Sequence, residues 1–319
     1  MYFGSVRFFK HLILSVITLM ILVPTAGCFV LMAQVQSLQR ELESQKASLH
    51  VPVNDVENRD EDIPEANEGS DEQKAPEEGL APNILDGDLV YQGKYPWLCV
   101  DKAAEYVTPT EKTVYLTFDD GPSTYTAQVL DILAAKDAPS TFFVKYDTTL
   151  SDDDRAAMYR RIVKEGHTLA IHSAFHQYSV IYSSIEAYLD DFAFLSEKIE
   201  GITGVKSDIF RFPGGSKNDY IKPIREELIA EMTRRGYTYY DWDVTSASAD
   251  ANATKESIYS YVTSGVSGAN RQSAVVLIHD AGPAAAAVVA ALPDIIDSLK
   301  TSGYKFEVLN NKVKPPQIQ

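Results

Sequence analysis

The sequence is poor in cysteine, since only two of its 319 residues are of this type. Cys28 lies in an apolar run and Cys99 stands just before the region that we expect to be globular. We therefore expect neither a disulfide framework nor a cysteine-rich metal site. Any metal site in this chain has to use histidine and carboxylate ligands.

Basic residues are also scarce, with 29 Lys and Arg against 45 Asp and Glu and a formal net charge of -16. Nucleic-acid binding needs clustered Lys and Arg, so this balance argues against a nucleic-acid partner. More than half of the excess is local, because residues 55–78 hold eleven acidic residues against Arg59 and Lys74, a net of -9. The rest of the chain is mildly acidic, and its length suffices for one sizeable globular domain.

Charge is absent from one long apolar run, residues 12–33. At about 1.5 Å of rise per residue, a helix of this length spans the roughly 30 Å hydrocarbon core of a membrane. Arg7 and Lys10 precede the run, which predicts a cytoplasmic N-terminus over residues 1–11, a transmembrane anchor, and export of everything that follows. A cleavable signal peptide is the competing interpretation, and a lipoprotein acylated at Cys28 is a third.

Two polar segments follow the apolar run. Residues 34–50 carry a stripe at alternating spacings of three and four, which predicts a short stalk helix that could pair two chains in a dimer. The stripe consists of Val35, Leu38, Leu42, Gln45 and Leu49. Residues 51–84 are acidic and rich in Pro, Asn, Gly and Ser, which predicts a disordered linker. A lead-in segment is expected over residues 85–112.

From residue 113 onward, apolar β-branched runs alternate with helical patterns, which predicts an α/β domain over 113–311 and a C-terminal tail over 312–319. Strands are expected at 114–118, 140–144, 168–171, 208–212, 238–244, 274–278 and 305–309. Strict alternation with near-continuous apolar strands predicts a parallel sheet, and about seven strands favour a distorted, incomplete (β/α) barrel. An open doubly wound sheet is the alternative.

The best-defined helix is expected over residues 152–165. It begins with aspartates, which the helix dipole favours at that end, and stops at Gly166, a good C-terminal breaker. His167 follows without a second histidine or acid at ligand spacing. We interpret it as a packing or hydrogen-bonding histidine.

Side chains with catalytic chemistry follow two of the expected strands. Asp119 and Asp120 end the first strand and precede a Gly-Pro turn, which alone is more often structural than catalytic. His172 and His176 follow the third strand, and a spacing of four places both imidazoles on one side of a helical turn. Two imidazoles and a carboxylate describe a hydrolytic metal site that favours zinc, with cobalt or another first-row ion as an option.

Three further groups lie at strand ends. Arg211 ends the fourth expected strand, Asp241 and Trp242 lie in the fifth, and His279 ends the sixth. Each has a structural explanation by itself, as an ion pair, a core aromatic or a capped strand end. All five groups nevertheless share the edge at which parallel barrels assemble active sites.

These residues resemble, in order and in type, the five motifs of the NodB-homology polysaccharide deacetylases, grouped as carbohydrate esterase family four. The motifs read TFDDGP at 117–122, HSAFH at 172–176, RFPGG at 211–215, DW at 241–242 and LIH at 277–279. The similarity covers about residues 95–309. It implies a metal-dependent hydrolase with one divalent cation.

The resemblance also implies a role for each motif residue. Asp120, His172 and His176 would bind the metal, while Asp119 would stay free as the catalytic base. His279 would protonate the leaving amine, and the backbone N–H of Gly214 would stabilise the oxyanion. The supporting roles would fall to Arg211, which orients Asp119, to Asp241, which orients His279, and to Trp242 and Leu277, which shape the acetyl pocket.

One departure concerns the third motif, because many members carry an aromatic residue after its proline, whereas this chain has Gly214 and Gly215. The change would remove a side-chain wall over the substrate groove. With the predicted anchor, the resemblance favours removal of N-acetyl groups from peptidoglycan N-acetylglucosamine outside the cell. N-acetylmuramic acid, an exopolysaccharide, chitin oligomers and acetylxylan are alternative substrates, and a catalytically silent wall-binding module is an alternative of another class.

Overall fold

The computed structural model describes residues 90–102 and 105–317. The predicted N-terminal segment, transmembrane anchor, stalk and linker, residues 1–84, lie outside the described residues. Within the described ranges, every helix is too short or too polar to cross a membrane.

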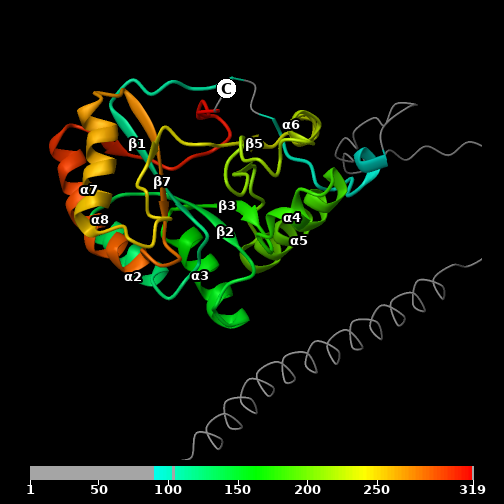
Figure 1. Ribbon diagram of the computed structural model, residues 1–319, viewed down its shortest axis with the longest axis horizontal. Coiled ribbons are helices and arrows are strands. Elements are labelled where there is room, and N and C mark those ends of the chain that lie inside the picture. Colours follow the sequence, from blue (N-terminus) through cyan, green and yellow to red (C-terminus); the bar gives the residue numbers. More distant parts are fainter. Residues whose placement is uncertain (1–89, 103–104, 318–319) are drawn as a thin grey trace, which may run out of the picture. The chain divides into compact units, whose positions relative to one another are not determined.

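A curled, wholly parallel sheet forms the centre of the domain (Figure 1). Its strands are β1 (Thr113–Asp119), β2 (Thr141–Lys145), β3 (Thr168–Ser173), β4 (Ile209–Phe210), β5 (Thr238–Tyr239), β6 (Val244–Thr245), β7 (Ser273–His279) and β8 (Lys305–Phe306). They are ordered β5-β4-β3-β2-β1-β7-β6, and β8 pairs with the beginning of β1. The result is a half-barrel of parallel strands, consistent with the distorted barrel predicted from the sequence.

The strand expected over 238–244 is instead two short strands at opposite ends of the sheet order. Tyr240 still donates its backbone N–H to Phe210 O in β4 (2.9 Å), whereas Asp243 donates to Val275 O in β7 (2.9 Å). The chain between β5 and β6 therefore crosses from one edge of the half-barrel to the other. An apolar run alone does not reveal this, because pairing with β4 or β7 depends on distant segments.

Helices surround the sheet on its outer side (Figure 1). They are α2 (Thr126–Ala135), α3 (Asp152–Lys164), α4 (Tyr178–Ile181), α5 (Ile185–Thr203), α6 (Arg225–Arg234), α7 (Lys255–Thr263) and α8 (Ala285–Thr301), with the short turns η1 (Val90–Gly93) and η2 (Ser264–Gly268). Apolar side chains of these helices and of the outward strand positions form the larger core. A smaller cluster, which includes Tyr115, Phe143, Tyr240 and Leu309, fills the concave side of the sheet.

Helix α3 illustrates how the sequence sets the helix boundaries. Ser151 caps its N-terminus by accepting the backbone N–H of Asp154, and acidic residues occupy its first turn. The helix ends before Gly166, whose φ of +84° is easily reached only by glycine. His167 is buried and its Nδ1 accepts the Ser140 N–H at 3.1 Å, so the interpretation as a hydrogen-bonding histidine is confirmed.

The lead-in segment packs against α6 through one buried arginine, Arg235. Its guanidinium donates to the backbone oxygens of Tyr95 (2.8 Å) and Lys94 (2.6 Å) and to Glu231 Oε1 (2.6 Å). Val100 in turn donates its N–H to Arg235 O at 2.9 Å. These contacts make residues 90–100 part of the folded domain, ahead of its first strand.

Candidate active site

The candidate site residues lie where the strands end at their carboxyl edge. Asp119 is the last residue of β1, and its register partner in β7 is His279. His172 lies near the end of β3, and Arg211 directly follows β4. Because all strands are parallel, these ends share one edge of the half-barrel, as expected from the sequence.

One ligand atom from each of Asp120, His172 and His176 lies within 4.8 Å of the others. Asp120 Oδ1 is 3.6 Å from His172 Nε2 and 3.2 Å from His176 Nε2. Two of these residues have left-handed backbones, Asp120 with φ +71° and His176 with φ +57°. Such conformations cost roughly 1–2 kcal/mol each for residues other than glycine and are typical of functional sites.

The hydrogen bonding of His172 fixes which nitrogen faces the cluster. Its Nδ1 lies 2.9 Å from Arg211 O, and a carbonyl oxygen only accepts, so Nδ1 carries the proton. The lone pair of Nε2 then faces Asp120. Burial lowers the pKa of His172 to about 4, and burial together with His172 lowers the pKa of His176 to about 4. Both imidazoles are therefore neutral at pH 7, the form that binds metal ions.

Asp120 completes a donor set that suits a divalent cation. Burial opposes its ionisation, but His172, His176 and Lys145 outweigh that effect and lower its pKa. Its Oδ1 is buried and has no hydrogen-bond partner among the described residues; Lys145 Nζ is 3.7 Å away. An anionic oxygen without a donor beside two neutral imidazoles fits a first-row divalent ion.

Asp119 does not join this cluster and pairs with Arg211 instead. Arg211 Nη1 donates to Asp119 Oδ1 at 2.7 Å and to Thr117 Oγ1 at 2.8 Å. The other guanidinium nitrogens donate to the backbone oxygens of Tyr240 (2.9 Å) and Asp241 (3.0 Å). Both charged groups are buried, and burial raises the pKa of Asp119 although Arg211 opposes the rise.

The Asp241 side chain holds the loop that contains the two glycines. Its carboxylate accepts the backbone N–H of Ser216 at 2.9 Å and the Ser216 hydroxyl at 2.6 Å. The neighbouring Trp242 packs so closely that a Cβ on Gly215 would lie 2.9 Å from its ring. Asp241 therefore positions the segment that carries the Gly214 N–H. The expected action of Asp241 on His279 stays a prediction.

An aromatic ring does lie over Gly214, and it comes from α4. A Cβ at Gly214 would lie 2.9 Å from Tyr178 Oη and 3.0 Å from its ring. The same ring contacts His176 edge to face, with centroids 5.1 Å apart. Tyr178 thus fills space that a side chain at position 214 would need. Sequence reasoning did not single it out, because its proximity depends on how α4 packs.

Sequence reasoning also missed Ser248, which contacts His279. Ser248 Oγ is 3.0 Å from His279 Nδ1 and accepts the backbone N–H of His279 at 2.9 Å. Leu277, two residues earlier in β7, is buried and accepts the N–H of Ser246 at 2.9 Å. The serines lie in a small polar loop with no motif that distinguishes them from ordinary turn residues.

A second buried acid, Asp280, lies behind the first motif. Its Oδ2 accepts the hydroxyl of Thr126, while its Oδ1 has no partner among the described residues. Burial raises the pKa of Asp280 to about 7. A Cβ on Gly121 would lie 2.4 Å from Asp280 Oδ1, so only glycine fits at that point of the turn.

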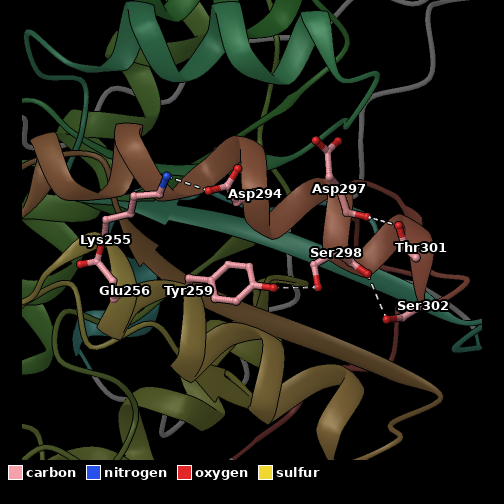
Figure 2. A pocket seen from close by; sticks show the side chains of 8 residues that line it. All are labelled: Lys255, Glu256, Tyr259, Asp294, Asp297, Ser298, Thr301 and Ser302. Carbon is pink, nitrogen blue, oxygen red and sulfur yellow. Dashed lines mark hydrogen bonds and ion pairs between the residues drawn. The ribbon is translucent and has the colours of Figure 1, made fainter.

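A pocket elsewhere on the domain lies between α7 and α8 (Figure 2). Its polar side chains contact one another: Lys255 Nζ is 2.7 Å from Asp294 Oδ2, and Tyr259 Oη donates to Ser298 Oγ at 3.3 Å. None of the candidate site residues lines it. This pocket is therefore separate from the candidate site at the carboxyl edge of the sheet.

Comparisons with known proteins agree with this assignment. The polysaccharide deacetylase family profile matches residues 106–233. A putative polysaccharide deacetylase of Bacillus subtilis is 33% identical over 211 residues, 64% of this chain and 70% of the relative. A peptidoglycan-N-acetylglucosamine deacetylase of Bacillus cereus is 30% identical over 203 residues, 63% of this chain and 70% of the relative.

A solved structure is also similar to this domain. It is the catalytic domain of a peptidoglycan N-acetylglucosamine deacetylase from Eubacterium rectale, with a TM-score of 0.62 and 37% sequence identity. The alignment covers 68% of this chain and 97% of that one.

Proposed function

Because the chain belongs to the polysaccharide deacetylases of carbohydrate esterase family four, we propose that it hydrolyses N-acetyl groups of peptidoglycan N-acetylglucosamine, with a divalent metal ion as cofactor. The observation that carries the proposal is the cluster of Asp120, His172 and His176 beside a second carboxylate, Asp119, that pairs with Arg211. Amide hydrolysis needs both an electrophilic centre and a free base, and this arrangement offers a place for each.

Asp120 and the two imidazoles would hold the cation, for which we propose zinc, with cobalt or another first-row ion as the alternative. When bound, such an ion supplies Lewis acidity that polarises the acetyl carbonyl and lowers the pKa of the attacking water. The tautomer of His172 is already set for this role, since Arg211 O holds the proton on Nδ1.

Proton transfer would divide between two residues on neighbouring strands. Asp119 accepts the proton of the attacking water, and its raised pKa brings it closer to the working pH of a general base. Arg211 keeps the carboxylate in place through the 2.7 Å hydrogen bond. His279, the register partner of Asp119, gives a proton to the leaving amine. The Gly214 N–H stabilises the oxyanion.

The acetyl pocket would be shaped by Trp242 and Leu277, while the ring of Tyr178 covers the glycine loop. Names of the relatives favour peptidoglycan N-acetylglucosamine as the substrate. N-acetylmuramic acid, exopolysaccharide, chitin oligomers and acetylxylan are the alternatives within the same chemistry. A silent wall-binding module is the alternative outside it.

We also propose that the chain is anchored in the cell membrane with its catalytic domain outside, facing the wall. The support is the uncharged run at 12–33 with its preceding Arg7 and Lys10. The stripe over 34–50 would allow a dimer through the stalk.

The test is acetate release from purified peptidoglycan and from the alternative glycans, with and without a chelator, followed by mass spectrometry of the digested fragments. We expect release from peptidoglycan, its loss with chelator, and its return with zinc. The fragments should lose acetyl groups on glucosamine. A protein that binds the wall but releases no acetate with any added metal would contradict the proposal.

A further inference from the structure

A buried serine, Ser248, contacts the Nδ1 side of the His279 imidazole, and a second buried serine, Ser246, contacts Ser248. Ser248 Oγ lies 3.0 Å from Nδ1, and it also accepts the backbone N–H of His279 at 2.9 Å. Ser246 Oγ lies 2.8 Å from Ser248 Oγ and accepts the backbone N–H of Ser248 at 3.3 Å. Both serines are at most 1% exposed, so their protons need partners inside the protein.

The backbone of residues 245–248 directs the Ser248 side chain towards His279 at the end of β7. Ser246 donates its backbone N–H to Leu277 O in β7 at 2.9 Å. The next residue, Ala247, has φ +56° and donates its N–H to Thr245 Oγ1 at 3.1 Å. A left-handed alanine costs roughly 1–2 kcal/mol. Such a conformation persists where the surrounding contacts enforce it, and here it brings the hydroxyl of Ser248 to Nδ1.

A count of protons gives the direction of the two hydroxyl contacts. Ser248 Oγ has one proton and two lone pairs, and the His279 backbone N–H takes one lone pair. If Ser246 donates to Ser248, then Ser248 donates to Nδ1, and each hydroxyl proton has an acceptor. If Nδ1 carried the proton instead, Ser248 would have to donate to Ser246, and the fully buried Ser246 hydroxyl would have no acceptor left among the described residues. The first arrangement is the one that satisfies the buried groups.

We propose that Ser248 is a positioning residue for His279, whose neutral ring it keeps protonated on Nε2 by donating from the Ser246–Ser248 relay to Nδ1. The inference rests on the proposed function only in giving His279 the task of proton donor to the leaving amine. A carboxylate at Nδ1 could only accept, and would favour the opposite tautomer. A hydroxyl also accepts after rotation, so the same contact holds the ring when both nitrogens carry protons. This doubly protonated ring is the form that would give its Nε2 proton to the leaving amine, and it would keep the proton on Nδ1 with Ser248 as the acceptor.

The tautomer is directly measurable by nitrogen NMR on the full chain labelled with 15N-histidine. The sequence has six histidines, and the spectrum of His279→Gln identifies the signal of interest. We expect the neutral His279 signal of the unsubstituted protein to report a proton on Nε2. In Ser248→Ala the preference for Nε2 should be lost, and in Ser248→Asp the proton should move to Nδ1. A proton on Nδ1 in the unsubstituted protein overturns the inference.

Kinetics separate positioning from simple structural support. Ser248→Ala should lower kcat about tenfold, at the low end for a residue that orients another, with KM and metal content nearly unchanged. Ser248→Thr keeps the hydroxyl and should restore most of kcat. An unchanged kcat in Ser248→Ala overturns the inference. Failure of the proposed function looks different, because the unsubstituted protein would then release no acetate while the NMR result stands.

Discussion

Replacing Arg211 with methionine should strongly destabilise the domain. The fully buried guanidinium makes four hydrogen bonds, of which one is to the buried Asp119 carboxylate. Removing one partner of a buried ion pair costs about 3–5 kcal/mol, because the other charge is left without compensation. We therefore expect Arg211→Met to lower the free energy of unfolding by that amount at pH 8.

The cost should depend on pH in a defined direction. Burial already raises the pKa of Asp119, and Arg211 opposes the rise, so loss of the arginine raises this pKa further. A carboxyl group whose pKa is higher in the folded state than in the unfolded state destabilises the protein once it ionises. The destabilisation grows as the pH rises from the unfolded-state pKa of 3.8 towards the folded-state pKa. The loss relative to the unsubstituted protein should therefore be smaller at pH 5 than at pH 8.

The assay is urea unfolding of both proteins at the two pH values, with Asp119→Asn and the double variant to complete a cycle. Contacting groups in one network couple by about 0.5–3 kcal/mol, and we expect about 2 kcal/mol for this pair. Arg211→Lys is the control, because lysine keeps the positive charge but lacks the planar array of N–H donors of the guanidinium. A loss below about 1 kcal/mol, well under the range for broken buried pairs, or a loss equal at both pH values, would refute the reasoning.

Three further predictions concern neighbouring groups. Asp119→Asn should abolish acetate release yet keep bound metal, whereas His172→Ala should lose both; equal metal loss by elemental analysis would show that base and ligand are misassigned. Gly214→Ala and Gly166→Ala both place alanine at positive φ and should each cost about 1–2 kcal/mol in urea unfolding. In Gly214→Ala the new Cβ would clash with the Tyr178 hydroxyl, whereas nothing lies within 4 Å of a Cβ at Gly166. We therefore expect only Gly214→Ala to lower turnover. Equal turnover in the two variants would contradict this prediction. Asp280, with its pKa raised to about 7, should cost the protein stability as the pH rises from about 4 to 7. Asp280→Asn should remove this pH dependence, and at pH 8 the free energy of unfolding of the variant should exceed that of the unsubstituted protein by at most about 4 kcal/mol. Stability curves that run parallel with pH for the two proteins would contradict the prediction.

The convergence of Asp120, His172 and His176 was predictable because it depends on two regularities of the sequence. Strict alternation of strands and helices implies parallel strands, and parallel strands share one carboxyl edge. Asp120, His172 and His176 each follow or end a recognisable strand, so the sequence already places them together. Asp119 and Arg211 also lie at the carboxyl ends of their strands, which is why they are close enough to form an ion pair.

The remaining features depend on contacts between segments that the sequence does not connect. The chain between β5 and β6 resembles one continuous strand, and only pairing with β4 and β7 divides it. Ser248 reaches His279 through a left-handed Ala247, a conformation that alanine shows no preference for. Tyr178 covers Gly214 because α4 is placed there by packing. These features depend on tertiary contacts, so they cannot be predicted from the local preferences of the residues involved.

The hydrogen bonds of the Arg235 guanidinium also bear on how the domain would respond to a mechanical force applied at its N-terminal side. Tension on a chain anchored upstream, as proposed, would arrive at residues 90–100 and pass to α6 through that guanidinium and the Val100 hydrogen bond. These hydrogen bonds come before β1 in the chain, so they would bear such a load ahead of the strands that carry the candidate site residues.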